Sequence, residues 1–127
     1  LKLAVKYANE RVVFNRPIGM NQGIQFPLAK AYAKLETALL MIHKGAWRFD
    51  NDEPCGEEAN IAKHEAAEAA FDACDASLQT HGGMGYAKEF HVERLWREVR
   101  LYKLAPVSQE MALNFIGEHV LNLPKSY

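Results

Sequence analysis

An arginine near the start of the chain and a glycine pair after its middle are the residues best suited to binding a phosphate. The planar guanidinium of Arg11 can donate two parallel hydrogen bonds to a phosphate diester. Gly82 and Gly83 lack side chains, so a phosphate or a ribose can come close and meet N–H groups that are free to donate. Plainer interpretations exist, since Arg11 can pair with Glu10 or another acid and the glycines can simply end a helix.

Amide side chains accompany both of these segments. Asn21 and Gln22 follow the arginine, and Gln79 precedes the glycines by three residues. An amide both donates and accepts hydrogen bonds, which suits contacts with sugars and bases. These residue types suit a ligand that carries phosphate and other polar groups, but taken alone they are more often explained by a surface ion pair and a helix cap.

No pattern in the chain is typical of a metal site or of a redox-active cysteine pair. The histidines form no E-x-x-H pair of the di-iron kind, and the cysteines show no C-x-x-C spacing. We therefore expect no bound metal and two reduced thiols, and we interpret His81 as a loop residue rather than a ligand. The residues concerned are His43, His64, His81, His91, His119, Cys55 and Cys74.

Two long helices are expected to position these residues. Leu28, Leu35, Ile42 and Phe49 recur every seven residues and predict a long helix over about 23–50, packed in a bundle. After turn residues, an alanine-rich stretch predicts a second helix that ends at the glycines. Its small side chains let neighbouring helices approach closely. That second helix is expected to run from about residue 57 to residue 81.

Shorter helices complete the predicted fold. Apolar spacing predicts a helix over 1–14, and a short polar helix follows over about 91–100. Pro106 suits the first turn of a final helix, because a proline needs no hydrogen-bond acceptor there. Its buried side is expected to comprise Met111, Phe115 and Val120. No segment alternates like a strand, so we expect an all-α, antiparallel up-down four-helix bundle with an extra short helix.

Composition excludes several classes of protein. The 127 residues are 49% apolar and 24% charged with a formal net charge of -1, as in a single folded domain rather than a disordered or nucleic-acid-binding segment. No apolar stretch is long enough to span a membrane. The chain opens with leucine and with residues typical of a helix interior, which suggests a piece of a longer chain.

Two stretches of the sequence carry a resemblance to a known family. Residues 7–22 read YANERVVFNRPIGMNQ, and residues 79–89 read QTHGGMGYAKE. They resemble the acyl-CoA dehydrogenase family, whose last domain carries E-R-x-x-F-G-x-P-I-x-x-x-Q and, much later, Q-x-x-G-G-x-G-Y-x-x-E. The spacing of Arg94 and Arg97 agrees as well. The resemblance implies that residues 1–127 form one C-terminal FAD-binding helical domain.

The resemblance also implies which residues contact the cofactor. Arg11 would contact the pyrophosphate of an FAD held with a neighbouring subunit, and Val13 stands where relatives offer a backbone or hydroxyl contact. The amides of Asn21 and Gln22 would reach the adenine and ribose side. The glycine segment would form a second part of the cradle. The full set of implied FAD-binding residues is Arg11, Val13, Asn21, Gln22, Gln79, Gly82, Gly83, Ser108 and Glu110.

Two positions depart from the family's pattern. Asn15 replaces the glycine that usually follows Phe14, and asparagine is the next residue to accept a left-handed backbone, so the turn can survive. Pro106 stands where many relatives carry the catalytic glutamate of a Y-E-G-T sequence. The base is therefore expected upstream of Leu1, as in isovaleryl-type relatives, or absent. Ser108 matches the threonine of that sequence but can equally serve as a helix-start hydroxyl.

The resemblance implies an FAD-dependent oxidoreductase that desaturates an acyl-CoA thioester between its alpha and beta carbons. An electron-transfer flavoprotein or a similar acceptor would take the electrons, and the subunits would form a dimer of dimers in the cytoplasm or the mitochondrial matrix. A flavin monooxygenase or oxidase of the same fold is an alternative, favoured by the missing glutamate. A non-catalytic helical assembly domain is another. The chain alone is expected to be inactive, because the family's other domains enclose the flavin ring and the acyl chain.

Overall fold

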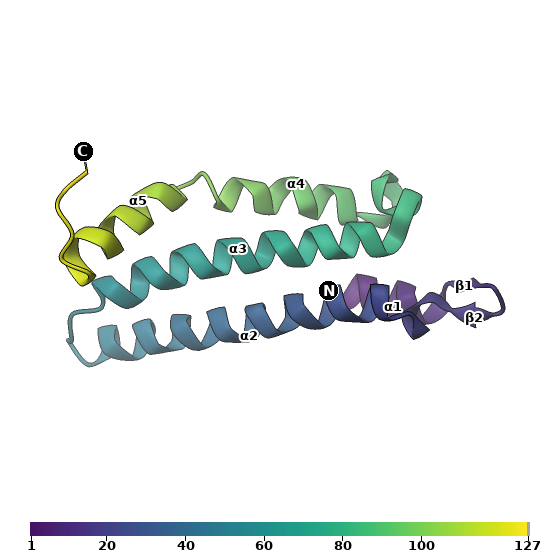
Figure 1. The fold of residues 1–127 in the computed structure, drawn as a ribbon, viewed down its shortest axis with the longest axis horizontal. Helices are drawn as coiled ribbons and strands as arrows, with labels where there is room; N and C mark the ends of the chain where they lie inside the picture. The colour runs from purple at the N-terminus through teal and green to yellow at the C-terminus, as the bar shows by residue number, and fades with distance from the viewer. Residues whose placement is uncertain (127) are drawn as a thin grey trace.

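The computed structural model describes residues 1–126 as an elongated antiparallel bundle of helices (Figure 1). Its middle helix, α3, contacts every other α-helix and lies between α2 on one side and α4 and α5 on the other. The five α-helices are α1 (Lys2–Glu10), α2 (Gln22–Asp50), α3 (Gly56–His81), α4 (Val92–Tyr102) and α5 (Gln109–Phe115). This confirms the all-α bundle expected from the sequence.

The ends of the two long helices follow from local backbone chemistry. α2 begins after Asn21, whose backbone is extended, and ends before a left-handed turn at Asp52. α3 carries Glu57 and Glu58 in its first turn, where acidic groups interact favourably with the positive end of the helix dipole. It ends at Gly82, which has a φ of +57°. Both predicted helices are confirmed to within one residue at each end.

Small side chains form most of the core between the helices. The buried positions of α3 include Ala62, Ala67, Ala69 and Ala73, and α2 turns Ala31 and Ala38 toward the bundle. Alanines allow two helix axes to approach closely, which is consistent with the expected packing. Among residues 1–126, Val92 is the largest side chain that is fully buried. The helices are therefore closely spaced, and the core between them contains few large buried side chains.

Part of the seven-residue repeat of α2 points away from this core. Leu28 is 9% exposed, whereas Ile42 is 44% exposed and Phe49 is 73% exposed. A repeat of apolar residues identifies an apolar face without identifying what covers it. The end of α2 that carries Phe49 thus offers apolar surface that no other described residue covers.

A two-stranded hairpin connects α1 to α2, and the expectation of no strand was wrong here. β1 (Val12–Val13) pairs with β2 (Arg16–Pro17) in antiparallel register. The turn residues Phe14 and Asn15 have φ values of 52° and 63°, as in the type I′ turns that match the twist of paired strands. Asn15 takes the left-handed backbone expected of it. Because the hairpin begins at residue 12, α1 ends at Glu10 rather than at residue 14.

The start of the last helix also differs from the sequence prediction. Pro106 follows a cis peptide bond and lies outside the helix, which begins at Gln109. Ser108 supplies the cap, since its Oγ accepts a hydrogen bond from the backbone N–H of Met111 at 3.3 Å. The buried residues of α5 are Gln109 and Ala112, while Met111 is 47% exposed. The short helical turns are η1 (Ile18–Met20), η2 (Gly82–Tyr86), η3 (Lys88–Phe90) and η4 (Ile116–Val120).

No helix in the described part of the chain combines the length and the apolar character needed to cross a membrane. α2 has 29 residues, but lysines, glutamate, arginine and aspartate interrupt it.

A buried carboxylate joins α2 to α3 near the turn between them. Glu58 is 2% exposed, and its Oε1 lies 3.0 Å from Lys44 Nζ and 3.3 Å from Arg48 Nη1. Arg48 also donates from Nε to the carbonyl of Pro54 at 2.9 Å. The hydrogen bond from Lys44, together with one from the backbone, holds the pKa of the Glu58 carboxyl below its ordinary value.

The Glu58 ion pairs make the stability of the bundle depend on pH. Because the pKa is lowered in the folded state, the stabilisation is present above the unfolded pKa of about 4.3 and disappears as pH falls through the folded pKa. We expect Glu58→Gln to lower the urea midpoint at about pH 7 and to differ less from the wild type near about pH 3. The exposed Glu36→Gln serves as the control. A Glu58→Gln deficit that stays constant with pH would contradict the ion-pair interpretation.

Candidate functional site

A surface hollow of about 490 Å³ lies where the end of α1, the hairpin and the end of α3 meet. It brings together five of the nine predicted cofactor residues, although they come from segments almost 70 positions apart in the sequence. The predicted residues that line it are Arg11, Val13, Gln79, Gly82 and Gly83. Tyr7, Ile18, Thr80, His81 and Met84 complete the lining.

Arg11 is the first residue after α1, and the helix end and the hairpin both hold its backbone. Its N–H donates to the carbonyl of Tyr7 at 2.8 Å, and its own carbonyl accepts from the N–H of Ile18 at 2.9 Å. Within residues 1–126 its exposed guanidinium forms no hydrogen bond or ion pair. Pairing with Glu10 or another acid is therefore not found. The five guanidinium donors remain available to a ligand in the hollow.

The two glycines present open backbone to the same hollow. A β-carbon built at Gly82 or at Gly83 would meet no atom within 4 Å, so both positions face free space. Gly82 needs its lack of a side chain for a φ of +57°, and its N–H donates to the carbonyl of Gln79 as the cap of α3. The expected free N–H group is thus absent at Gly82, where the capping role holds. A ligand still has room to approach this backbone closely.

The amides after the arginine lie outside the hollow. Asn21 Oδ1 accepts from Arg16 Nη2 at 2.6 Å, and its Nδ2 donates to the carbonyl of Ile18 at 3.0 Å. The Asn21 side chain therefore braces the base of the hairpin. Gln22 opens α2 on the exposed surface. The sequence analysis did not anticipate that Gln25 would donate to the carbonyl of Gly19 at 2.8 Å, because no motif marks that residue.

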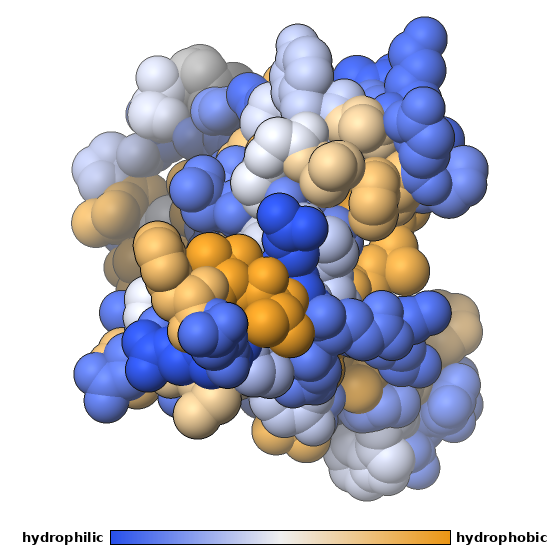
Figure 2. Space-filling model, turned by 90° about the vertical axis from the view of Figure 1, so that its right-hand side faces the viewer, coloured by the Kyte–Doolittle hydropathy of each residue, from blue (hydrophilic) through white to orange (hydrophobic). Residues whose placement is uncertain are grey.

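Exposed apolar side chains gather at the hairpin end of the bundle, which Figure 2 turns toward the viewer. Phe14 is 95% exposed at the tip, although the left-handed backbone is costly for a bulky residue. Val12, Met20 and Met84 are also exposed. Figure 2 shows strongly apolar atoms gathered near the centre of this face, with hydrophilic ones around them. The face combines an unpaired cation with apolar contact surface.

Ser108 and Glu110 lie at the start of α5, away from this hollow. Their neighbour Gln109 donates a hydrogen bond to the carbonyl of His64 in α3. His64 precedes Gln79 by about 15 residues, which corresponds to roughly 22 Å along the helix axis. Hydrogen bonds from its own backbone and from the Ser108 hydroxyl hold the pKa of Glu110 below its ordinary value. The predicted cofactor residues therefore fall into two groups along the bundle.

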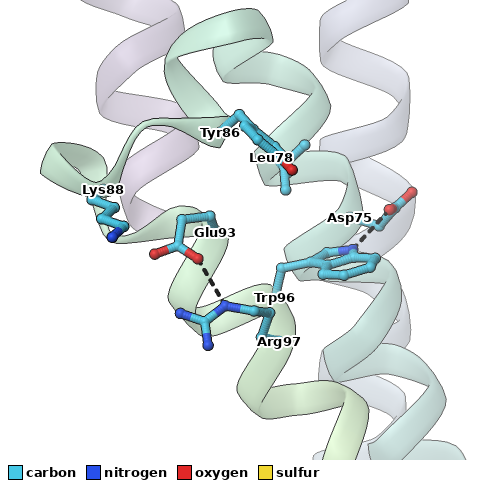
Figure 3. A pocket seen from close by; sticks show the side chains of 7 residues that line it. All are labelled: Asp75, Leu78, Tyr86, Lys88, Glu93, Trp96 and Arg97. Atoms are coloured by element: carbon cyan, nitrogen blue, oxygen red, sulfur yellow. Dashed lines mark hydrogen bonds and ion pairs between the residues drawn. The ribbon is translucent and has the colours of Figure 1, made fainter.

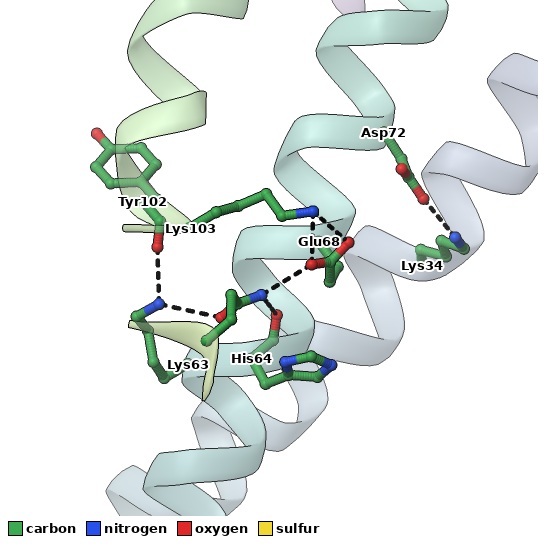
Figure 4. Close-up of polar contacts among 8 residues, drawn as sticks. Lys34, Lys63, His64, Glu68, Asp72, Tyr102 and Lys103 are labelled. Atoms are coloured by element: carbon green, nitrogen blue, oxygen red, sulfur yellow. Dashed lines mark hydrogen bonds and ion pairs between the residues drawn. The ribbon is translucent and has the colours of Figure 1, made fainter. Parts of the chain in front are cut away.

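A network of hydrogen bonds fastens the segment that contains Pro106 onto α3 (Figure 4). Lys63 Nζ donates to the carbonyl of Tyr102 at 2.7 Å and to Gln109 Oε1 at 3.1 Å. Gln109 Nε2 donates in turn to Glu68 Oε1 at 3.0 Å. Gln109 is 6% exposed, so its bonds are shielded from water. The segment is consequently fixed in place even though a proline fills the glutamate position.

Glu68 is the carboxylate bonded to this segment, and its environment makes it a weak base. Lys103 Nζ lies 2.6 Å from Glu68 Oε1 and donates to Oε2 at 2.8 Å. These bonds from Lys103, and then the one from Gln109, lower the pKa of Glu68. A lowered pKa reduces the tendency to take up a proton. Both oxygens of Glu68 are engaged by Lys103 and Gln109, so taking up a substrate proton would cost these contacts.

A second hollow, of about 480 Å³, lies between α3, η2 and α4 (Figure 3). Three of its four charged groups are already engaged, since Trp96 Nε1 donates to Asp75 Oδ1 at 3.0 Å and Arg97 Nε donates to Glu93 Oε2 at 2.8 Å. Lys88 is the charged lining residue whose side chain forms no hydrogen bond or ion pair within residues 1–126. None of the predicted cofactor residues lines it. The hollow beside Arg11 is thus the better candidate for an anionic ligand.

The described residues include no group of three or more His, Cys, Asp or Glu side chains placed to hold a metal ion. By contrast, the hollow beside Arg11 fits a phosphate-bearing cofactor, because it pairs an unsatisfied guanidinium with open glycine backbone.

Comparisons with known proteins identify relatives of the chain in sequence and in fold. The chain is 43% identical to acyl-CoA dehydrogenase FadE12 of Mycobacterium tuberculosis over 98% of its length, and 42% identical to a 3-(aryl)acrylate reductase of Clostridium sporogenes over 93%. Its fold matches butyryl-CoA dehydrogenase from Megasphaera elsdenii with a TM-score of 0.91 and 30% identity, covering 94% of this chain. The chain spans about a third of each of these proteins, namely 32%, 31% and 31%.

A family model assigns the chain directly. The model described as acyl-CoA dehydrogenase, C-terminal domain, matches residues 1–121, which is nearly the whole chain. The two motifs, the helical bundle and the relatives all agree with that match. The chain therefore belongs to the acyl-CoA dehydrogenase family and corresponds to its C-terminal domain.

Proposed function

We propose that this chain is the FAD-binding and assembly domain of a flavin-dependent acyl-CoA dehydrogenase, and that the hollow beside Arg11 receives the FAD pyrophosphate. The observation that carries the proposal is the exposed guanidinium of Arg11, unpaired within residues 1–126, beside the open backbone of Gly82 and Gly83. A diphosphate would supply oxygen atoms that accept hydrogen bonds from these donors. Gln79 and Val13 would contact the same cofactor from the rim of the hollow.

The two groups of predicted residues would serve two different FAD molecules. Ser108 and Glu110 lie beside the first half of α3, whereas Gln79 lies near its end. Hydrogen bonds of Lys63 and Gln109 hold the segment of Ser108 and Glu110 against α3. The proposal is that Arg11 and the glycines reach a flavin held mainly by a partner subunit. Ser108 and Glu110 would contact the flavin of their own subunit. Each cofactor would then bridge two copies of the full-length protein, with Asn21 and Gln22 toward its adenine side.

The full-length protein would desaturate an acyl-CoA thioester, and this chain would orient its cofactor. Bound FAD would accept the hydride from the beta carbon of the thioester. The described residues contribute binding and orientation, because Pro106 occupies the glutamate position and Glu68 is a weak base. A carboxylate from the part of the protein that precedes this chain would remove the alpha proton. An electron-transfer flavoprotein or similar acceptor would reoxidise the cofactor.

The absence of a glutamate at Pro106 favours a second candidate, a flavin monooxygenase or oxidase built on the same fold. Such a protein would bind FAD through the same hollow but would pass electrons to oxygen. Anaerobic reduction of the bound flavin by acyl-CoA excludes a monooxygenase, since only the dehydrogenase and an acyl oxidase reduce it with that substrate. The rate of reoxidation by oxygen then separates these two.

The exposed face of α2 is the surface that assembly would bury. Leu40 is 70% exposed, and Trp47, which lies about two helical turns later on the same side of α2, is 60% exposed. Exposed apolar side chains that share one side of a helix mark protein interfaces. We assign this face to a second copy of the full-length protein, as in the dimer of dimers implied by the family resemblance.

Removing the Arg11 guanidinium is expected to weaken FAD binding by about 10- to 100-fold, the value of charge-assisted hydrogen bonds worth about 1.5–3 kcal/mol. Titration of the full-length apoprotein with FAD would compare Arg11→Ala with Arg94→Ala, which removes an arginine from the exposed Arg94 and Glu98 pair. Equal affinities in the two variants would refute the proposed phosphate contact. A parent protein without flavin affinity would leave only the non-catalytic assembly domain.

Adding one methyl group to the cradle is expected to block the ligand without harming the fold. A β-carbon at Gly83 meets nothing within 4 Å, so Gly83→Ala should keep the melting temperature of the apoprotein. The same methyl group should lower FAD affinity by about tenfold, because it occupies the space of the cofactor. Gly117→Ala, whose β-carbon would meet only Leu123 at 3.9 Å, is the control. Unchanged FAD affinity in Gly83→Ala would place the cofactor elsewhere.

Charging the α2 face is expected to dissociate the oligomer. Leu40→Asp places a carboxylate on a surface that the proposed interface buries, while Leu40 contributes little to the monomer core. Sedimentation of the full-length protein should show smaller species than in the wild type. Lys30→Gln, which removes an exposed charge roughly three helical turns before Leu40 on α2, should sediment like the wild type. Identical sedimentation of Leu40→Asp and wild type would exclude this face as the interface.

A further inference from the structure

Three aromatic rings form a cluster at the candidate cradle, two of them in its lining, and connect the segments that form it. Tyr7 of α1 stacks on His81 of α3 with ring centroids 4.4 Å apart and an interplanar angle of 25°. Phe90 of η3 meets Tyr7 edge-on at 5.9 Å and His81 at 5.8 Å. Such pairs add to the stability gained from burial alone. The cluster therefore fastens the end of α1 to the end of α3.

The His81 ring is held in one orientation. The residue is 4% exposed, and its Nδ1 lies 2.7 Å from the carbonyl oxygen of Ser77, one turn earlier in α3. A carbonyl only accepts hydrogen bonds, so Nδ1 carries the proton in this contact. The bond and the stack together fix both the tilt of the ring and its distance from Tyr7. A phenyl ring would retain the stack and lose the bond.

The two ligand-facing elements begin directly beside this stack. Arg11 lies one helical turn after Tyr7, and its N–H donates to the Tyr7 carbonyl at 2.8 Å. Gly82 follows His81 in the chain, and both residues line the hollow with Arg11. The stack therefore joins the backbone segment that carries Arg11 to the segment that leads into the glycines.

We propose that His81 is the positioning residue of this cradle, holding Arg11 and the Gly82–Gly83 backbone at the spacing of a diphosphate. The inference rests on the proposed FAD site and deepens it. A cradle held at the correct spacing before binding loses less entropy when the cofactor arrives, which raises affinity without any direct contact. His81 acts through Tyr7 and the following glycines, so it is a positioning residue rather than a catalytic one.

Two substitutions in the full-length protein distinguish the contribution of the stacked ring from that of its hydrogen bond. His81→Phe keeps an aromatic ring and loses the Nδ1 donor, whereas His81→Asn keeps an N–H donor and loses the stack. We expect both variants to bind FAD at least about tenfold more weakly, with a changed visible circular dichroism spectrum of the bound flavin. A purely structural role would lower the apoprotein melting temperature and leave affinity and spectrum unchanged, which would overturn the inference.

A double-mutant cycle tests whether His81 acts through Arg11. If the ring positions the guanidinium, the pair Arg11→Ala and His81→Phe should bind FAD hardly more weakly than Arg11→Ala alone. Fully additive losses would overturn the inference while the proposed FAD site stands. A parent protein that binds no FAD would overturn both. Should His81→Asn fail to fold, Tyr7→Leu removes the same stack from the α1 side, with the same expected loss of affinity.

Discussion

The row of small side chains along α3 sets the spacing of the helices packed around it. Ala62, Ala67, Ala69 and Ala73 let neighbouring helices approach closely, and α3 consequently contacts every other α-helix of the bundle. The same residues bury little apolar area, because an alanine removes far less surface from water than a leucine does. Much of the larger apolar surface, including Phe49, is left for contacts beyond this chain.

Sequence patterns predicted the long helices well because strong local signals mark their ends. Turn residues precede α3 and Gly82 follows it, so both ends were visible without tertiary information. The hairpin was missed because two-residue strands leave no alternation to detect, and its first turn residue, Phe14, rarely adopts a left-handed backbone. Pro106 was misplaced because a cis peptide and a start at Gln109 leave no clear mark in the sequence.

Sequence motifs predicted some residues of the candidate site, whereas other contacts in it depend on tertiary packing. Family motifs pointed to Arg11, Gln79 and the glycines, and the fold brings these residues to one hollow. The motifs could not reveal that Asn21 is engaged by Arg16, since such a bond depends on the hairpin. His81 was interpreted only as a loop residue, because a single histidine carries no signal of the ring that will stack on it.

The continuity of α3 has a consequence for how the two groups of cofactor residues behave together. The helix runs without an interior glycine or proline from the network around Gln109 to the hollow beside Arg11. If the two groups serve different flavins as proposed, a displacement at one end of this stiff element reaches the other. Filling one site would then change the affinity of the next, and linkage requires the effect to be equal in both directions. The bundle would thereby make cofactor loading of the assembly cooperative.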